Sequence, residues 1–141
     1  MRKRIALALL LLCIPIAAVA DGLSSIANAR AVADATMEKF GLEEFERGYE
    51  SLKPYWPLPI VEIDNLSNQT RTQWPLVQQR FGKSLGTEFI KEEKVGEAFV
   101  RFTYIQKFER HAVRWLFVFY KPKSEWLING VTFDDQIGRL F

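Results

Sequence analysis

The chain has 141 residues, of which 48% are hydrophobic, 26% are charged and 13% are aromatic. This length and composition fit one globular domain with a sizeable core, and they exclude a disordered or fibrous protein. One cysteine and one histidine exclude a disulfide framework, a zinc finger and most metal sites. We therefore expect a single small module with no metal site and no cofactor.

The first 20 residues have the pattern of a secretory signal peptide. Three basic residues precede an apolar run, and Ala18, Val19 and Ala20 form a cleavage site of small residues. The uncharged run from Ile5 to Ala20 has 16 residues, fewer than the roughly 20 that a membrane-spanning helix needs. We expect cleavage after about Ala20, export to the periplasm and no membrane span in the mature domain, 21–141. The alternative is that the segment is retained as an anchor.

Cleavage there changes the charge of the protein. The whole chain has a formal net charge of +2, but the signal segment holds three of the 19 basic residues and none of the 17 acidic ones, so the mature chain has a net charge of −1. Cys13 is removed as well. A near-neutral domain lacks the basic surface that nucleic-acid binding needs. We therefore expect no nucleic-acid partner.

Helices are predicted over about 23–82. Apolar side chains recur at a spacing close to 3.6 residues between Leu23 and Leu52, which indicates an amphipathic helix with Ser24 or Ser25 as its N-cap. Gly41 favours a division of this region into two helices.

Three prolines follow in the stretch 53–59. They predict an extended, irregular connector whose two aromatic residues enter the core. A further helical region begins near Asp64 and ends at Gly82. Pro75 favours a restart inside this region, with Thr72 as the cap of a short last helix.

After Gly86 the pattern changes from helical to alternating. Strands are expected at 87–95, 97–109, 112–121 and 126–134, separated by short turns at Gly96, at Arg110 and His111, and at 122–124. The sequence therefore predicts an α+β fold, in which N-terminal helices pack on a curved four-stranded antiparallel meander over about 86–134.

Antiparallel pairing decides which strand residues share a face. A two-residue turn at Arg110 and His111 places Tyr104 opposite Phe117 and Phe102 opposite Phe119. The face that contains these pairs is predicted to be the core, and the other members expected on it are Phe108, Val113, Trp115, Leu127, Val131 and Phe133.

The opposite face of the predicted sheet is also rich in apolar residues. Its expected members are Phe99, Arg101, Thr103, Ile105, Lys107, Arg114, Leu116, Val118, Tyr120, Trp126 and Ile128. Exposed apolar surfaces larger than a few hundred Å² mark interfaces or ligand grooves. We interpret this face as a homodimer interface with Arg101, Lys107 and Arg114 at its rim. The alternatives are a groove for a small apolar ligand, a cover formed by the C-terminal tail, or a register that is wrong by one residue.

Two segments carry a resemblance to a known fold family. They are the run TQWPLVQQRFG at 72–82 and the segment WLING at 126–130. Together with the order of helices before a long meander, they resemble small secreted bacterial domains of unknown function with the nuclear transport factor two-like, cystatin-related fold. The resemblance implies a cone-shaped pocket between helices and sheet, frequent dimerisation through the sheet, and no single activity.

Two branches of this fold class make specific demands on the residues. Protease inhibitors of the cystatin type present a Gln-x-Val-x-Gly hairpin, whereas the nearest stretch here, EKVG at 93–96, has another lead residue and lacks a spacer. Enzymes of the cone-shaped fold place an acid or a histidine and a tyrosine inside an apolar pocket. The candidates for such chemistry are His111, Tyr104, Tyr120, Asp134 and Asp135.

Each candidate also has an ordinary structural role, in a turn, in the core or as a cap. The sequence contains no Gly-x-Ser-x-Gly elbow and no phosphate loop. We therefore expect an exported, non-catalytic binding or protein-interaction module that forms a homodimer. The alternative is a cofactor-free lyase or isomerase that acts on a small apolar substrate. A pocket that holds Tyr104 or His111 beside a carboxylate favours the enzyme, whereas an interior packed shut by its tryptophans favours the module.

Overall fold

The computed structural model describes residues 19–141, which form three α helices and a four-stranded antiparallel sheet with the strand order β1-β2-β3-β4. The elements are α1 (Ile26–Gly41), α2 (Phe45–Glu50), η1 (Lys53–Tyr55), α3 (Ile60–Phe81), β1 (Ser84–Val95), β2 (Phe99–Phe108), β3 (Ala112–Tyr120), β4 (Leu127–Asp134) and η2 (Ile137–Leu140), where η marks a 3₁₀ turn. The predicted α+β class and the meander are confirmed. The predicted signal peptide lies outside the described residues, except for its last two.

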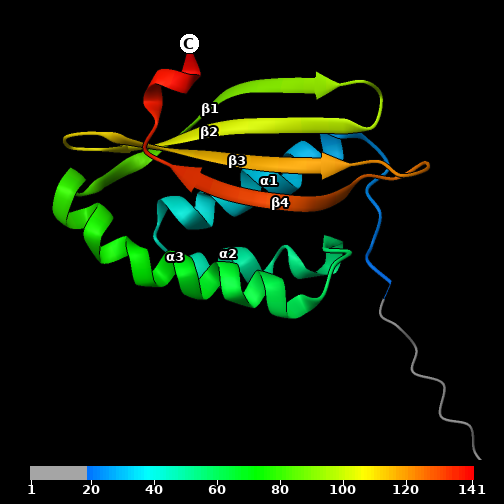
Figure 1. Cartoon of the computed structure of the whole chain (residues 1–141), viewed down its shortest axis with the longest axis horizontal. Coiled ribbons are helices and arrows are strands. Elements are labelled where there is room, and N and C mark those ends of the chain that lie inside the picture. The colour runs from blue at the N-terminus through cyan, green and yellow to red at the C-terminus, as the bar shows by residue number, and fades with distance from the viewer. Residues whose placement is uncertain (1–18) are drawn as a thin grey trace, which may run out of the picture.

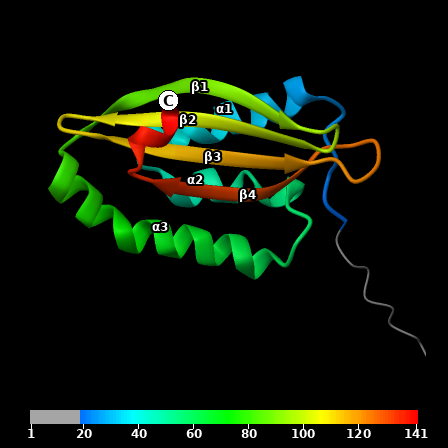
Figure 2. The same ribbon diagram turned by 45° about the horizontal axis from the view of Figure 1, so that its top comes forward.

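The helices and the C-terminal turn lie on opposite sides of the sheet. In Figure 1 α1 lies behind the strands, α2 and α3 lie below them, and η2 rises above them. The turned view in Figure 2 shows η2 in front of β2 and β3. The sheet therefore has an inner face, which packs on the helices, and an outer face, which η2 covers in part.

The first two helices form as the sequence predicts. Ser25 is the N-cap of α1, where its Oγ accepts a hydrogen bond of 3.1 Å from the Asn28 backbone N–H. The helix ends at Gly41, and Glu43 in the following turn has a φ of 61°, which is the left-handed region. The chain can therefore reverse and start α2 at Phe45.

The connector and α3 differ from the prediction. The connector is not irregular throughout, because Lys53–Tyr55 forms a 3₁₀ turn, and α3 begins at Ile60 directly after Pro59. It then continues to Phe81 without the expected restart at Pro75. Pro75 is exposed, so the backbone carbonyl that its missing N–H leaves without a partner can bind water. The buried side of α3, which includes Trp74, keeps both halves of the helix on the core.

The hairpin between β2 and β3 has a register two residues away from the predicted one. Tyr104 pairs with Trp115 rather than with Phe117, and Phe102 pairs with Phe117. The turn consists of Glu109 and Arg110, because the Phe108 N–H donates to the His111 carbonyl at 2.9 Å. A shift by an even number of residues leaves each side chain on its face. The predicted inner face of both strands is therefore correct although the pairs are wrong.

A β-bulge in β4 corrects the predicted faces of the last strand. Val118 pairs with Gly130, but its neighbour Phe119 pairs with Ile128, so Asn129 is an extra residue. The bulge turns Ile128 into the core, where it is fully buried, and moves Leu127 off the inner face. Trp126, also predicted on the outer face, is buried as well.

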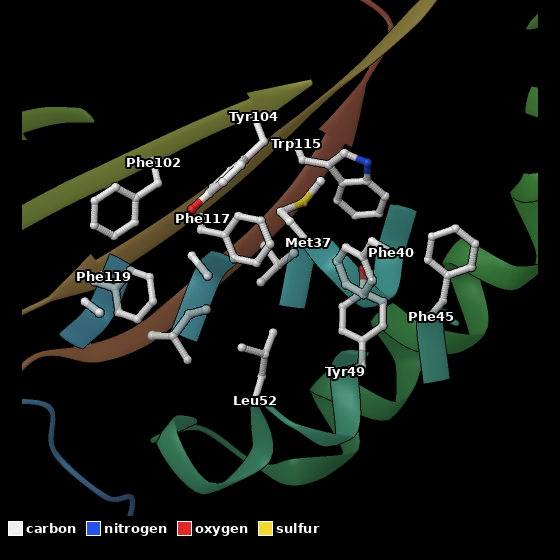
Figure 3. Close-up of a cluster of buried hydrophobic side chains, with 14 of the residues drawn as sticks. Met37, Phe40, Phe45, Tyr49, Leu52, Phe102, Tyr104, Trp115, Phe117 and Phe119 are labelled. Carbon is white, nitrogen blue, oxygen red and sulfur yellow. The ribbon is translucent and has the colours of Figure 1, made fainter. Parts of the chain in front are cut away.

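The core between the helices and the sheet consists mainly of aromatic side chains. Figure 3 shows side chains from α1 and α2 meeting those from β2 and β3. The Phe40 ring lies 4.5 Å from the Trp115 ring, and the Phe45 ring lies 4.3 Å from the Trp74 ring, measured between centroids. Trp56, Trp74 and Trp115 are 5%, 4% and 0% exposed. These three tryptophans thus fill the interior between the helices and the sheet.

Candidate functional site

Tyr104 is the catalytic candidate that meets a carboxylate. Its hydroxyl donates a hydrogen bond of 2.6 Å to Asp34 Oδ1 on α1, and Arg30 Nε donates to the same oxygen at 2.7 Å. The Arg30 guanidinium also lies 3.3 Å from the centre of the Phe89 ring. A tyrosine, an acid and an arginine therefore form one cluster between α1 and the sheet.

The hydrogen bonds of this cluster join α1 to β2, which is a structural role. Tyr104 is buried, and this burial, together with its hydrogen bond to Asp34, raises the pKa of its phenol far above the ordinary value of 10.0. The phenol therefore stays protonated and cannot act as a base at neutral pH. The spacing of Arg30 and Asp34 by four residues is a helical ion-pair signal in the sequence, but their contact with Tyr104 depends on the tertiary structure.

The remaining catalytic candidates lie elsewhere and have other partners. His111 packs against the Phe81 ring at 4.6 Å, and its Nε2 lies 3.2 Å from the Asp135 carbonyl oxygen. Tyr120 stacks on Phe99 with 4.9 Å between the ring centres. The structure therefore does not bring His111 and Tyr104 into one site.

Asp134 is held by Arg114 on the outer face. Two hydrogen bonds of 3.1 and 2.7 Å join the guanidinium to both carboxylate oxygens, and the Gln136 N–H also donates to Asp134 at 2.9 Å. The hydrogen bonds from Arg114 lower the pKa of Asp134 below its ordinary value of 3.8. Asp134 thus binds the backbone just before η2 and stays ionised at neutral pH.

The outer face is only in part the surface that the sequence predicts. Arg114, expected at the rim, is buried, and Thr103 is buried too. Arg101 and Lys107 are exposed, but Arg101 pairs with Glu93 at 2.8 Å and Lys107 approaches Glu88 at 3.8 Å. Each of these three basic residues has an acidic partner. Ile105 and Leu116 are half-buried.

An apolar patch remains open at the end of the outer face that lies away from η2. We call Val95, Phe99, Val118 and Tyr120 the outer patch. Val95 is 72% exposed and Phe99 is 40% exposed, while the other two are half-buried. A shallow hollow of about 350 Å³ lies beside them, lined by Glu93, Lys94, Val95, Phe99, Val100, Arg101 and Val118. Of the interface residues predicted from the sequence, Val118, Tyr120 and Arg101 therefore lie together.

Neither a metal centre nor a membrane span is found in the part of the chain that the structure describes. Among residues 19–141, the structure brings together no group of three or more histidine, cysteine, aspartate or glutamate residues suited to a metal ion. No helix within these residues is both long and apolar enough to cross a membrane.

Comparison with known proteins gives no match to a family model, to a curated protein or to a solved structure. The resemblance to nuclear transport factor two-like domains therefore stays a prediction, and the function has to be argued from the residues themselves.

Proposed function

We propose that this chain is an exported, non-catalytic binding module that forms a homodimer through the outer patch. The observation that carries the proposal is the exposure of Phe99, stacked on Tyr120 at the end of the outer face that lies away from η2. Large aromatic side chains open to solvent on one contiguous surface are typical of interfaces. A two-fold dimer would bury this patch against its own copy.

The charges around the outer patch favour burial against a second copy. Arg101 donates to Glu93 Oε2 from both Nε and a terminal nitrogen, at 3.1 and 2.8 Å. These bonds lower the pKa of Glu93 below its ordinary value of 4.5, so the pair stays ionised and mutually neutralised. Covering the patch would then bury Arg101 and Glu93 as a pair, which avoids the cost of burying either charge alone.

The packed interior supports a binding role over the conversion of a small substrate. A lyase or isomerase of the kind considered above needs room beside its acid or base for the substrate. Here the Tyr104 ring lies 5.5 Å from the Phe117 ring and 5.3 Å from the Phe89 ring, and its hydroxyl is bound to Asp34. Its neighbours therefore take the space that a substrate would need.

Export is supported by the sequence pattern alone, and it has a direct test. Protein recovered from the periplasm of its host should begin at Asp21, as read by N-terminal sequencing. A chain that begins at Met1 and sediments with membranes would contradict cleavage and indicate a retained anchor.

The dimer is tested by the solution mass of the protein, measured by light scattering over a dilution series. We expect twice the monomer mass, falling on dilution, and a folded monomer for Val118→Glu and Val95→Glu, because only the dimer removes the added charge from water. Leu42→Glu is the matched control, since Leu42 is 73% exposed and lies directly after α1, outside the outer patch. It should leave the mass unchanged.

A monomer at every concentration would overturn the homodimer. A dimer that persists in both Val118→Glu and Val95→Glu would place the interface elsewhere. Val95→Glu keeps the test valid if Val118→Glu fails to fold, because Val95 is far more exposed than Val118.

A further inference from the structure

Strand β4 has an edge that no other strand covers along most of its length. The strand order leaves β4 with β3 as its one neighbour within the sheet. Hydrogen bonds at both ends of the β2-β3 pair, from Phe108 N–H to His111 and from Lys121 N–H to Ala98, show that odd-numbered residues of β3 bond to β2. Even-numbered ones then bond to β4, where Leu116 pairs with Thr132. The backbone groups of Val131 and Phe133 consequently point away from β3.

The same edge already accepts a strand at its beginning. Leu23 N–H donates to the Trp126 carbonyl at 3.0 Å, and Trp126 N–H donates to the Leu23 carbonyl at 2.8 Å. The chain then leaves the edge, because the Asp21 N–H bonds to the Pro54 carbonyl at 2.7 Å instead. Strand pairing therefore stops at Trp126, and the rest of the edge is left without a partner among the described backbone contacts. Such an edge is a template for a further strand.

Helix α3 runs beside this edge (Figures 1 and 2). Three hollows are lined by residues of both α3 and β4. Their volumes are about 400, 230 and 390 Å³ in order along β4. On the strand side the first is lined by 129–132, the second by 131–133 and the third by 133–135. Each step is close to two residues, which is the repeat of side chains on one side of a strand.

The lining of the three hollows is uncharged in its middle. Charged residues occur at the ends, with Glu62 at the first hollow and Arg80, Asp134 and Asp135 at the third. Between these ends α3 contributes amide, hydroxyl and aliphatic side chains, namely Asn65, Leu66, Gln69, Thr70, Gln73, Leu76 and Val77. This surface matches an uncharged ligand with apolar side chains.

One buried polar group at the first hollow lacks a partner. Trp56 lines this hollow and is buried, and its indole N–H has no hydrogen-bond acceptor among the described residues. Buried indole N–H groups ordinarily find an acceptor. A backbone carbonyl or a hydroxyl of a bound ligand would supply one.

We propose that the groove between α3 and β4 binds an uncharged peptide of another protein in extended form, as a fifth strand beside β4. Its backbone would bond to Val131 and Phe133, and apolar side chains at positions i, i+2 and i+4 would enter the three hollows. A second copy of the domain fits this edge less well, because it would bring its own α3 to the same place. The site is separate from the outer patch and does not depend on the homodimer.

The test selects binders from a phage-displayed library of random heptapeptides against the purified full-length protein. We expect enriched sequences with apolar residues at alternate positions and few charges. The best peptide, labelled with fluorescein, should lose at least about tenfold in affinity for Gln73→Trp, which fills the second and third hollows, as measured by anisotropy. Asn68→Trp is the matched control, because Asn68 is exposed on α3 and does not line a hollow. It should bind like the unchanged protein.

A second variant and a hydrogen-exchange measurement test the same proposal independently. Leu76→Glu places a charge in the third hollow at a residue that is 58% exposed, so it weakens peptide binding without a burden on folding. Amide hydrogen exchange should slow at Val131 and Phe133 when the peptide binds. The proposal is overturned if nothing is enriched, if the peptide binds Gln73→Trp and Leu76→Glu unchanged, or if Val95→Glu abolishes binding instead. The last result would assign the peptide to the outer patch.

Discussion

Trp115 and Gln106 are joined inside the core by a hydrogen bond of 3.1 Å from the indole nitrogen to the amide oxygen. The Gln106 amide nitrogen donates in turn to the Phe40 carbonyl at 3.1 Å and to Ser84 Oγ at 3.0 Å. Gln106 is fully buried. One amide side chain therefore links α1, β1 and β3 within an otherwise aromatic core, and its polar atoms have partners there.

This link predicts the effect of Gln106→Leu. The variant keeps a similar volume but leaves the Trp115 N–H without an acceptor, while the Phe40 carbonyl keeps the Glu43 N–H as a donor. The free energy of unfolding should therefore fall by about 1–3 kcal/mol. Urea unfolding followed by tryptophan fluorescence measures the change. Gln136→Leu is the control, because Gln136 is exposed and should change little. Equal stability of both variants would mean that the buried network contributes nothing.

Gly48 lies in α2, where intrinsic helix propensity favours alanine over glycine by about 1 kcal/mol. In this structure a Cβ at position 48 would lie 2.3 Å from Phe40 Cε1. Phe40 is fully buried among other rings, so the overlap with the new Cβ can be removed only if side chains in the core move. Overpacking of this kind costs about 1–3 kcal/mol of stability. We expect Gly48→Ala to lower the melting temperature. Gly138→Ala, whose Cβ meets nothing within 4 Å, should not lower it. A stabilised Gly48→Ala would show that helix propensity outweighs packing here.

We expect the buried phenol of Tyr49 to make the folded protein less stable at alkaline pH. Its hydroxyl bonds to Thr70 Oγ1 at 2.9 Å, and burial raises the pKa of the phenol from 10.0 to about 12. Because the folded state favours the protonated phenol, this contribution is complete below pH 10 and is lost as pH rises toward 12.

The comparison of the unchanged protein with Tyr49→Phe isolates this effect, since phenylalanine does not titrate. Their difference in unfolding free energy should shrink by as much as about 2–3 kcal/mol between neutral pH and pH 12, as measured by urea unfolding. Tyr104 titrates in both proteins and cancels. Parallel loss of stability in the two proteins would contradict the raised pKa of Tyr49.

The order of helices and strands and the inner face of β2 and β3 were predictable because they depend on local periodicity. Ser25 begins α1, and alternation from Val100 to Phe108 places Phe102 and Tyr104 in the core. Phe102 and Tyr104 are in the core despite the wrong hairpin register, because a shift by two residues leaves each side chain on the same face. The inner face of β2 and β3 therefore needed only the repeat length of a strand, whereas the bulge in β4 was not predictable from that repeat.

The register itself depended on contacts between distant segments. The Arg110 N–H bonds to the Phe81 carbonyl at 2.9 Å, and its guanidinium bonds to the carbonyls of Gln79 and Arg80. The end of α3 thus holds Arg110 in the turn and leaves His111 to pair with Phe108. No local sequence signal contains this docking.

The candidate sites, like the fold, depend partly on local sequence patterns and partly on contacts between distant segments. The sequence by itself determined the fold class, the aromatic core and the apolar character of Val118 and Tyr120, because composition and alternation carry that information. The tertiary structure decided that Tyr104 is tied to Asp34 and that Gln106 is satisfied in the core. It also decided that three hollows follow the open edge of β4. The partners in these two hydrogen bonds are 70 and 66 residues apart in the chain, so they meet only after the helices have packed on the sheet. A contact between residues so far apart produces no periodic pattern in one sequence.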